Sequence, residues 1–251
     1  MGIVVMIRNN KQMSYFRECL LGLMALDVAD EIYLSSGFFQ EYLEFPGYKS
    51  HAYYVTAEKN IHDQSLTTVL QNKVNFKSII LVGCKEENKT KSGITVPLPY
   101  AKSVQKAQNW TESFRNFYVQ MRNAYPNKQV TAYYAKQLNW HAKISVFCEK
   151  GIPVAGIIGS TNFTRPAFGA TQFYNVEADV LLFDDKLGSQ ITTILNDIDQ
   201  YINRNKLDTA GLLVLSSQNL KFYGGTTGMD WLKKEYEYIV DQITSGELVK
   251  A

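Results

Sequence analysis

The chain has 251 residues, of which 45% are hydrophobic and 13% aromatic, so it is long and apolar enough to bury one large core, and disorder is not expected. The formal net charge of +2 neither requires nor excludes a nucleic-acid partner, because a local basic groove can lie within a balanced total. The three cysteines, Cys19, Cys84 and Cys148, are odd in number and widely spaced. We expect buried reduced thiols, and neither a disulfide framework nor a metal site.

The sequence shows no targeting or membrane segment. Residues 1–6 lack the pattern of a signal peptide, and the longest apolar stretch, 20–29, is too short to span a bilayer. We therefore expect a cytoplasmic protein that has no membrane partner.

Helical and strand patterns alternate along the first half of the chain. Apolar residues recur at helical spacing in some segments, while others are short apolar runs typical of buried strands. The elements expected here are a helix at 12–28, a strand at 31–36, a helix near 62–73, a strand at 77–83, a helix near 111–124 and a strand at 129–134. Between the second strand and the third helix, residues 85–108 are polar and turn-rich.

The second half begins with three strands in succession, at 141–148, 152–159 and 176–183, and Gly151 with Pro153 marks a hairpin between the first two. A helix near 186–203, a short strand at 212–215 and a last helix from about 229 follow. The alternation predicts an α/β fold with a mixed β-sheet sandwiched between helices. We expect a single domain over 1–251, with its core at about 12–205 and a C-terminal helical extension at about 206–251.

Polar residues that can take part in catalysis lie close together in the sequence between residues 141 and 183. His141 and Lys143 are two apart on an expected strand, so their side chains leave the same face. The imidazole can attack phosphorus or move protons, and the ammonium can hold a phosphate oxygen. These two residue types in this spacing point to chemistry on a phosphate.

Hydrogen-bond donors follow the expected strand at 152–159, and an acidic residue lies at the start of the expected strand at 176–183. Gly159 lets the chain turn, after which Ser160 and Asn162 can direct a hydroxyl and an amide at the same phosphate. Glu177 begins the following strand, where its carboxylate can orient a histidine ring. A single histidine on a strand or a single Gly-Ser turn is most often structural. The full set, in this order on consecutive strands, favours a functional site.

This stretch resembles the HKD motif of the phospholipase D superfamily, in which His-x-Lys is followed by Gly-Ser-x-Asn. More narrowly, His141-Ala-Lys, Ser160-Thr-Asn-Phe-Thr-x-Pro and Asn175-x-Glu-Ala are similar to the catalytic domain of restriction endonucleases of the BfiI/NgoFVII type. The sequence Ser36-Gly37-Phe38, at the end of the expected strand at 31–36, is also similar to a Ser-Gly-Phe at the same place in those nucleases. The resemblance implies a phospholipase D-like mixed sheet between helices.

One position departs from the superfamily pattern. Cys148 stands where many members have Asp, five residues after the lysine. That Asp usually has a structural part away from the phosphate, and the nuclease branch also lacks it. The departure weakens a phospholipase interpretation more than a nuclease one.

The resemblance implies a metal-independent phosphodiesterase without a cofactor. In that mechanism His141 of one subunit forms a phosphohistidine, and His141 of a second subunit acts as acid and then base. Lys143, Ser160 and Asn162 stabilise the charge, and Glu177 positions the imidazole. Because superfamily sites use two motifs and this chain has one, a homodimer with a shared site is expected.

A DNA endonuclease is the favoured function, with DNA preferred over RNA as the nucleic-acid partner. Basic residues near the motif, Lys136, Lys150 and Arg165, could contact flanking phosphates, and Thr161 could join them in binding substrate. Two alternatives stay open: a hydrolase of phospholipids or other small phosphodiesters, and a non-catalytic nucleic-acid-binding scaffold. With about 45 residues after position 205, no separate domain for reading DNA sequence is expected, so specificity would come from loops such as 85–108 or from a partner.

Overall fold

A computed structural model describes most elements of the chain. The described residues are 2–8, 14–39, 76–84, 89–91, 94–96, 104–135, 140–164, 167–168, 176–205, 212–215, 228–246 and 248–250.

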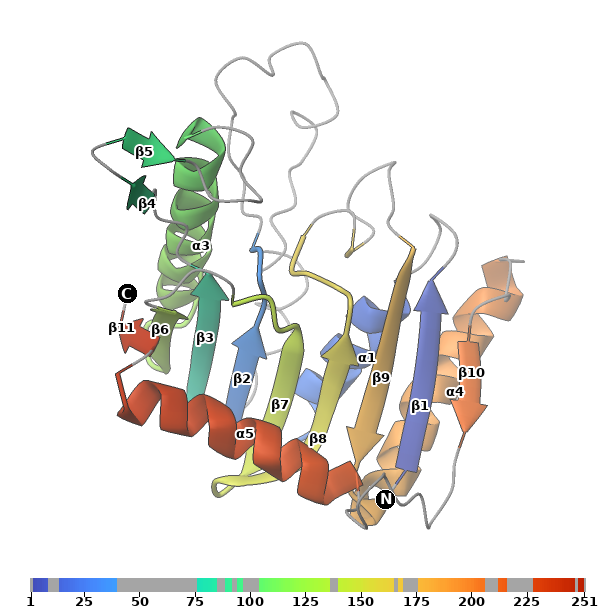
Figure 1. The fold of residues 1–251 in the computed structure, drawn as a ribbon. Coiled ribbons are helices and arrows are strands. Elements are labelled where there is room, and N and C mark those ends of the chain that lie inside the picture. Colours follow the sequence, from blue (N-terminus) through green and yellow to red (C-terminus); the bar gives the residue numbers. More distant parts are fainter. Residues whose placement is uncertain are drawn as a thin grey trace.

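Nine strands of the described residues form one mixed sheet, in the order β10-β1-β9-β8-β7-β2-β3-β6-β11 (Figure 1). The strands are β1 (Gly2–Arg8), β2 (Glu31–Ser35), β3 (Ser78–Cys84), β6 (Gln129–Ala135), β7 (Ile144–Glu149), β8 (Ile152–Gly159), β9 (Glu177–Phe183), β10 (Leu212–Leu215) and β11 (Leu248–Lys250). β2, β3 and β6 run parallel to one another, and the other pairings are antiparallel. Two short strands, β4 (Lys89–Lys91) and β5 (Ile94–Val96), pair separately.

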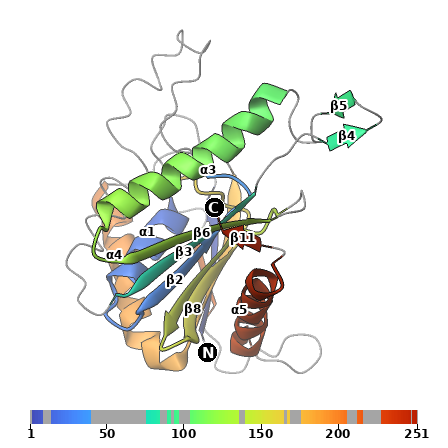
Figure 2. The same ribbon diagram turned by 90° about the vertical axis from the view of Figure 1, so that its left-hand side faces the viewer.

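Helices cover both faces of this sheet. The helices are α1 (Tyr15–Ala25), α3 (Val104–Ala124), α4 (Gly188–Asn205) and α5 (Gly228–Thr244), with a short 3-10 turn, η2 (Asp185–Leu187), before α4. Figure 2 shows α1, α3 and α4 on one face and α5 on the other. The expected α/β fold, with a mixed sheet between helices, is confirmed. In the described part of the chain, no helix combines the length and the apolar character that crossing a membrane needs.

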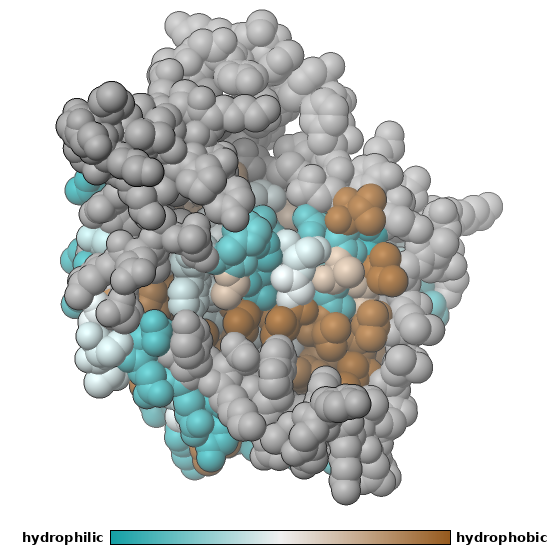
Figure 3. All heavy atoms as spheres, viewed as in Figure 1, coloured by the Kyte–Doolittle hydropathy of each residue, from teal (hydrophilic) through white to brown (hydrophobic). Residues whose placement is uncertain are grey.

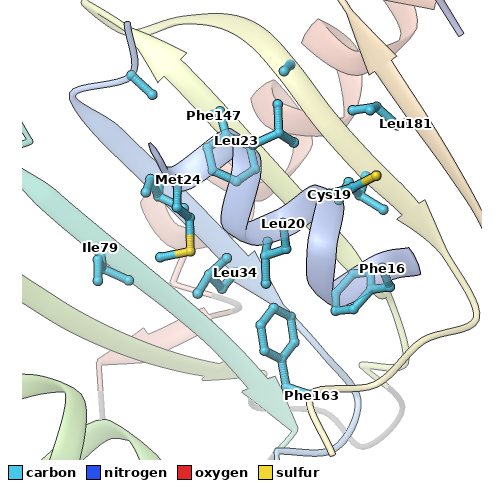
Figure 4. Packing of buried hydrophobic residues seen from close by; sticks show 14 of the residues in the cluster. Phe16, Cys19, Leu20, Leu23, Met24, Leu34, Ile79, Phe147, Phe163 and Leu181 are labelled. Carbon is cyan, nitrogen blue, oxygen red and sulfur yellow. The ribbon is translucent and has the colours of Figure 1, made fainter. Parts of the chain in front are cut away.

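The larger core lies between the sheet and α1, α3 and α4. Helix α1 begins after Ser14, whose hydroxyl accepts a hydrogen bond from the Arg17 amide, and it buries an apolar stripe at helical spacing. Figure 4 shows this stripe, which includes Leu20 and Leu23, packed against side chains of the sheet such as Phe147. A smaller cluster on the opposite face joins the sheet to Ile239 of α5.

Several element boundaries differ from the sequence expectations. Strand β1 was not expected, although its run of Ile and Val residues has high β propensity, and it lies between β10 and β9 inside the sheet. β10 and β11, from beyond residue 205, form the two edges of the sheet. α3 starts earlier than expected, since the Gln and Lys residues after Val104 are good helix formers. The helix expected near 62–73 lies outside the described residues.

The hairpin expected at Gly151 is confirmed. β7 ends at Glu149 and β8 begins at Ile152, with Lys150 and Gly151 between them at φ 53° and φ 77°. Positive φ at both central residues is the geometry of the two-residue turns whose twist matches antiparallel strands.

Strand β7 starts at Ile144, later than the expected strand over 141–148. Ile144 is paired with Ser35, the last residue of β2, so the ladder on that side ends there. Residues 140–143 are held instead by the Ser35 hydroxyl, which accepts from the Trp140 indole at 2.8 Å and donates to the Ala142 carbonyl at 3.3 Å. The Ser35 hydroxyl therefore joins the segment before β7 to the neighbouring strand on one side, and on the other side the Gly159 amide donates to the Lys143 carbonyl at 3.2 Å.

Candidate active site

The polar motif residues meet at one end of the sheet because of strand direction and register. β7 is antiparallel to both β2 and β8, and Ile144 at its start faces Ser35 and Ile158 near their ends. β8 is antiparallel to β9, with Gly159 opposite Asp179. The end of β2, the start of β7, the end of β8 and the start of β9 therefore lie together, which places residues 141–143, 160–162 and 177 at the same end.

His141 and Lys143 are in direct contact. The Lys143 Nζ lies 2.8 Å from Nδ1 and 3.2 Å from Nε2 of the exposed imidazole, and it donates to the His141 carbonyl at 2.8 Å. Partial burial and the neighbouring ammonium both lower the pKa of His141. Burial also lowers the pKa of Lys143, while Glu177 acts in the opposite direction. The pair thus favours a neutral imidazole, the form that can attack an electrophile.

Ser160 and Glu177 join the turn after β8 to the start of β9. The exposed Ser160 donates its hydroxyl proton to the buried Glu177 carboxylate and accepts from the Ala178 amide at 3.0 Å. The hydrogen bond described for Glu177 therefore fixes Ser160, and its charge also supports the protonated Lys143. Orientation of the imidazole by Glu177 stays a prediction.

Asp179 of β9 stabilises the same turn through hydrogen bonds with Thr161. Its carboxylate accepts from the Thr161 amide at 3.2 Å and from the Thr161 hydroxyl at 2.6 Å, and both residues are buried. A Cβ at Gly159 would lie 2.1 Å from Asp179 Oδ1, so only glycine allows the chain to pass this closely. The side chain of Thr161, which was expected to contact substrate, is directed at Asp179 within the protein.

Asn162 is held by residues that follow β2. Its Oδ1 accepts from the Ser36 hydroxyl at 3.1 Å and from the Phe38 amide at 3.2 Å. Phe163, the next residue, is buried in an aromatic cluster, 5.2 Å from the ring of Phe39 and 5.6 Å from that of Phe16. The turn that carries Ser160 and Asn162 is therefore anchored in the main core.

The basic fringe expected around the motif is described only in part. Lys136 and Arg165 lie outside the described residues. Lys150 lies in the β7–β8 hairpin, and since β7 runs for six residues, it is about 20 Å from the motif end of the sheet. The expectation that Lys150 flanks the motif is wrong, because a hairpin places its turn at the far end of both strands.

Sequence reasoning missed the roles of Ser36 and Asp179. The triplet Ser36-Gly37-Phe38 resembles the nuclease branch, but nothing in the neighbouring sequence indicates that it contacts Asn162. Asp179 gave a weak signal, since it is a second acid two residues after Glu177 in an otherwise apolar strand and so lies on the same face.

Together these groups offer a nucleophile or proton carrier, a cation and neutral donors at one place. Their chemistry fits an anionic ester whose charge grows during reaction. Within the described ranges, no three His, Cys, Asp or Glu side chains gather into a group that could hold a metal ion.

Comparison with protein families gives one match. Residues 106–207 match the family model described as the NgoFVII restriction endonuclease N-terminal PLD domain. This segment includes all the motif residues from His141 to Glu177, although it spans less than half of the chain. No curated protein matches significantly.

Solved structures show remote similarity. A phosphatidylserine synthase of Haemophilus influenzae is 13% identical, with a TM-score of 0.45 over 96% of this chain and 47% of its own. NucT from Helicobacter pylori is 15% identical, with a TM-score of 0.36 over 80% and 93% of the two chains. A yeast tyrosyl-DNA phosphodiesterase mutant is 15% identical, with a TM-score of 0.31 over 72% and 30%. The chain thus spans about half of the synthase and less than a third of the yeast enzyme.

Proposed function

We propose that this chain, in which residues 106–207 match the family model of the NgoFVII restriction endonuclease N-terminal PLD domain, is a metal-independent phosphodiesterase that cleaves DNA. The observation that carries the proposal is the meeting of the His141–Lys143 pair with Ser160 and Asn162 at one end of the sheet. These residues supply nucleophile, cation and donors without a resident metal or cofactor.

In the first step, an imidazole nitrogen of His141 attacks the phosphorus of a phosphodiester. A nitrogen–phosphorus bond forms while the bond from phosphorus to the leaving oxygen breaks. The lowered pKa of His141 supports this role, because the neutral ring has the lone pair that attack requires. The leaving oxygen takes a proton from His141 of the partner subunit, which starts in its protonated form.

In the second step, water replaces the histidine. The now neutral His141 of the partner subunit accepts a proton from water as the water oxygen bonds to phosphorus and the nitrogen–phosphorus bond breaks. Lys143 and Asn162 hold the non-bridging oxygens in both steps and stabilise the charge that develops on them, and Ser160 joins them when its hydroxyl proton turns from the Glu177 carboxylate to the substrate. Glu177 favours the protonated form of Lys143 throughout.

A homodimer follows from the need for two histidines on opposite sides of one phosphorus. Each chain has a single His-x-Lys pair, so a two-fold axis through the site would supply the second. Apolar side chains also lie exposed at the motif end of the sheet: Ile7 of β1 is 41% exposed and Val176, just before β9, is 72% exposed. Such residues suit the centre of an interface between subunits.

The catalytic unit would be one domain over residues 1–251. Its sheet combines β1 from the beginning of the chain with β10 and β11 from the end, which supports a single folding unit. Lys136 and Arg165 remain candidates for contacts to flanking phosphates.

The test is an assay of the purified chain in EDTA on single-stranded DNA, duplex DNA, RNA and a small diester dye. We expect cleavage of DNA in EDTA, because Lys143 and the neutral donors take the part that a divalent ion has elsewhere. The His141→Ala variant, checked for its fold by circular dichroism, should be inactive on every substrate. Activity that disappears in EDTA and returns with magnesium would contradict the mechanism, and cleavage of the dye alone would favour a small-diester hydrolase.

A further inference from the structure

We propose that the Ser36-Gly37-Phe38 segment after β2 is a positioning element of the active site, which fixes the amide of Asn162 and the ring of His141. The inference rests on the proposed function and extends the site beyond residues 106–207. None of the three residues needs to touch substrate.

The first observation is the orientation of the Asn162 amide. The Phe38 backbone amide can only donate, so the Asn162 atom that it faces at 3.2 Å must be the oxygen. The Ser36 hydroxyl lies against the same oxygen at 3.1 Å. With its oxygen held on this side, Asn162 has its Nδ2 group left to donate to a phosphate oxygen.

Ser36 is at the centre of this arrangement. It is completely buried, and its single hydroxyl proton is shared between the Phe38 carbonyl at 2.7 Å and the Asn162 Oδ1 at 3.1 Å, while its oxygen accepts from the Phe163 amide at 3.2 Å. One side chain therefore joins the turn after β2 to the turn after β8, although Ser36 and Asn162 are 126 residues apart in the chain. A buried hydroxyl with several partners allows little freedom to the groups around it.

The second observation is the contact between Gly37 and His141. A Cβ at Gly37 would lie 2.8 Å from His141 Cδ2, 3.2 Å from His141 Cα and 3.3 Å from the Trp140 carbonyl. The bare backbone of Gly37 is thus a surface against which the edge of the imidazole ring rests. Any larger side chain would push the ring and the segment that carries it.

A rigid base supports both contacts. Phe39, the residue after this segment, forms an isolated parallel bridge with Phe163, and the two rings stack at 5.2 Å, each 1% exposed. Packing in the core therefore sets the distance between the segment that carries His141 and the turn that carries Asn162. Errors of about 1 Å in such geometry can cost a hundredfold in rate, so a positioning role is energetically important.

The experiment is a double-mutant cycle for cleavage, with Ser36→Ala, Asn162→Ala and the double variant. Ser36→Ala should lower kcat on the order of ten- to a hundredfold with a smaller change in KM, and it should have little further effect when Asn162 is already Ala. Ser145→Ala is the matched control: Ser145 is equally buried on β7, but its hydroxyl has no hydrogen-bond partner among the described residues. It should keep wild-type kcat. Fully additive losses in the cycle, or a folded Ser36→Ala protein with wild-type kcat, would overturn the proposal.

A second arm uses Gly37→Ala and NMR, and it carries the test if Ser36→Ala does not fold. Gly37→Ala should lower kcat and shift the His141 ring resonances, while Ser36→Ala should shift the Asn162 side-chain amide pair. If the wild-type protein cleaves no substrate, the proposed function is contradicted. The positioning role can still be tested in that case, because the NMR shifts do not depend on turnover. Unchanged Asn162 and His141 resonances in both folded variants would contradict the positioning role.

Discussion

The pKa of His141 is lowered by partial burial of its ring and by the ammonium of Lys143, which contacts the ring. An ammonium within 3.2 Å of both ring nitrogens opposes a second positive charge, and partial burial of the ring acts in the same direction. The lysine thus has two parts in the proposed mechanism, since it holds phosphate oxygens and keeps the attacking ring neutral.

Replacing the lysine separates these two parts. In Lys143→Met the pKa of His141 should rise, because the burial remains but the like charge is gone. Cleavage should also fall on the order of a hundredfold, since a donor to the developing charge is lost. An NMR titration of the histidine ring protons measures the pKa, and His141→Ala identifies the resonance among the three histidines.

The matched control for this substitution is Lys186→Met. Lys186 is a surface lysine that pairs with Glu149 at the opposite end of β7, at 2.8 Å. It should leave both the His141 titration and the cleavage rate unchanged. A pKa of His141 that stays constant or falls in Lys143→Met would show that the lysine does not act on the ring.

At the scale of elements, the turn between β8 and β9 depends on a buried carboxylate. The pKa of Asp179 is raised to about 6, chiefly by burial and also by the nearby charge of Glu177, and these two effects outweigh the hydrogen bonds from Thr161, which lower the pKa. The ionised form therefore costs more in the folded protein than in the unfolded chain. The ionised Asp179 therefore destabilises the folded protein at the turn that positions Ser160 and Asn162.

The sign of the pH effect follows from this raised pKa. Above pH 6 the wild type carries the full cost of the buried charge, and as pH falls from about 6 towards 4 the folded state takes up a proton that the unfolded chain does not. Relative to Asp179→Asn, which does not titrate, the wild type should gain up to about 3 kcal/mol of unfolding free energy over this range.

Urea unfolding at several pH values measures the difference between the two proteins. Asp197→Asn, at an exposed aspartate of α4, is the control for the loss of one carboxylate. A wild type that loses stability relative to Asp179→Asn as pH falls from 6 to 4 would have the opposite sign and would reject the raised pKa.

At the scale of the whole molecule, one face of the sheet is left partly open near the motif. Ile7 lies opposite Ala178, and Val5 and Ile158 both lie opposite Val180, so these side chains share a face. Ile158 packs against the cluster that includes Ile239 of α5, which shows that this is the α5 face. Figure 3 shows apolar side chains gathered on it next to hydrophilic ones.

Subunit mixing tests whether two chains share one site. His141→Ala protein is added in excess to wild type under conditions that let subunits exchange, and cleavage is measured per wild-type chain. A heterodimer has one histidine at the shared site, so activity should fall below the value expected from dilution. Activity in strict proportion to the wild-type fraction, with exchange verified by differently tagged chains, would reject the shared site.

Asn162→Ala mixed with His141→Ala in the same way is a useful comparison. Because the shared site would need the donors and the histidines of both chains, neither variant should restore the other. Restored activity in this pair would indicate that one histidine and one asparagine, supplied by different chains, are enough for a site, and it would contradict the need for both histidines.

Much of the fold followed from local patterns in the sequence. The apolar runs at 31–36, 77–83 and 152–159 predicted strands, and Gly151 with Pro153 predicted the β7–β8 hairpin, since turn geometry depends on nearby residues. The grouping of His141, Lys143, Ser160, Asn162 and Glu177 was predictable for the same reason, because consecutive antiparallel strands bring these positions to one end.

The contacts between distant parts of the chain were decided by the tertiary structure. Nothing near residue 36 indicates that its hydroxyl meets Asn162, and nothing near Thr161 indicates that Asp179 holds its side chain inside the protein. The place of β1 within the sheet and the distance of Lys150 from the motif also depend on which strands pair and in which direction. Spacing along the sequence determines which face and which turn a residue occupies, but pairing and packing over long separations determine what that residue meets.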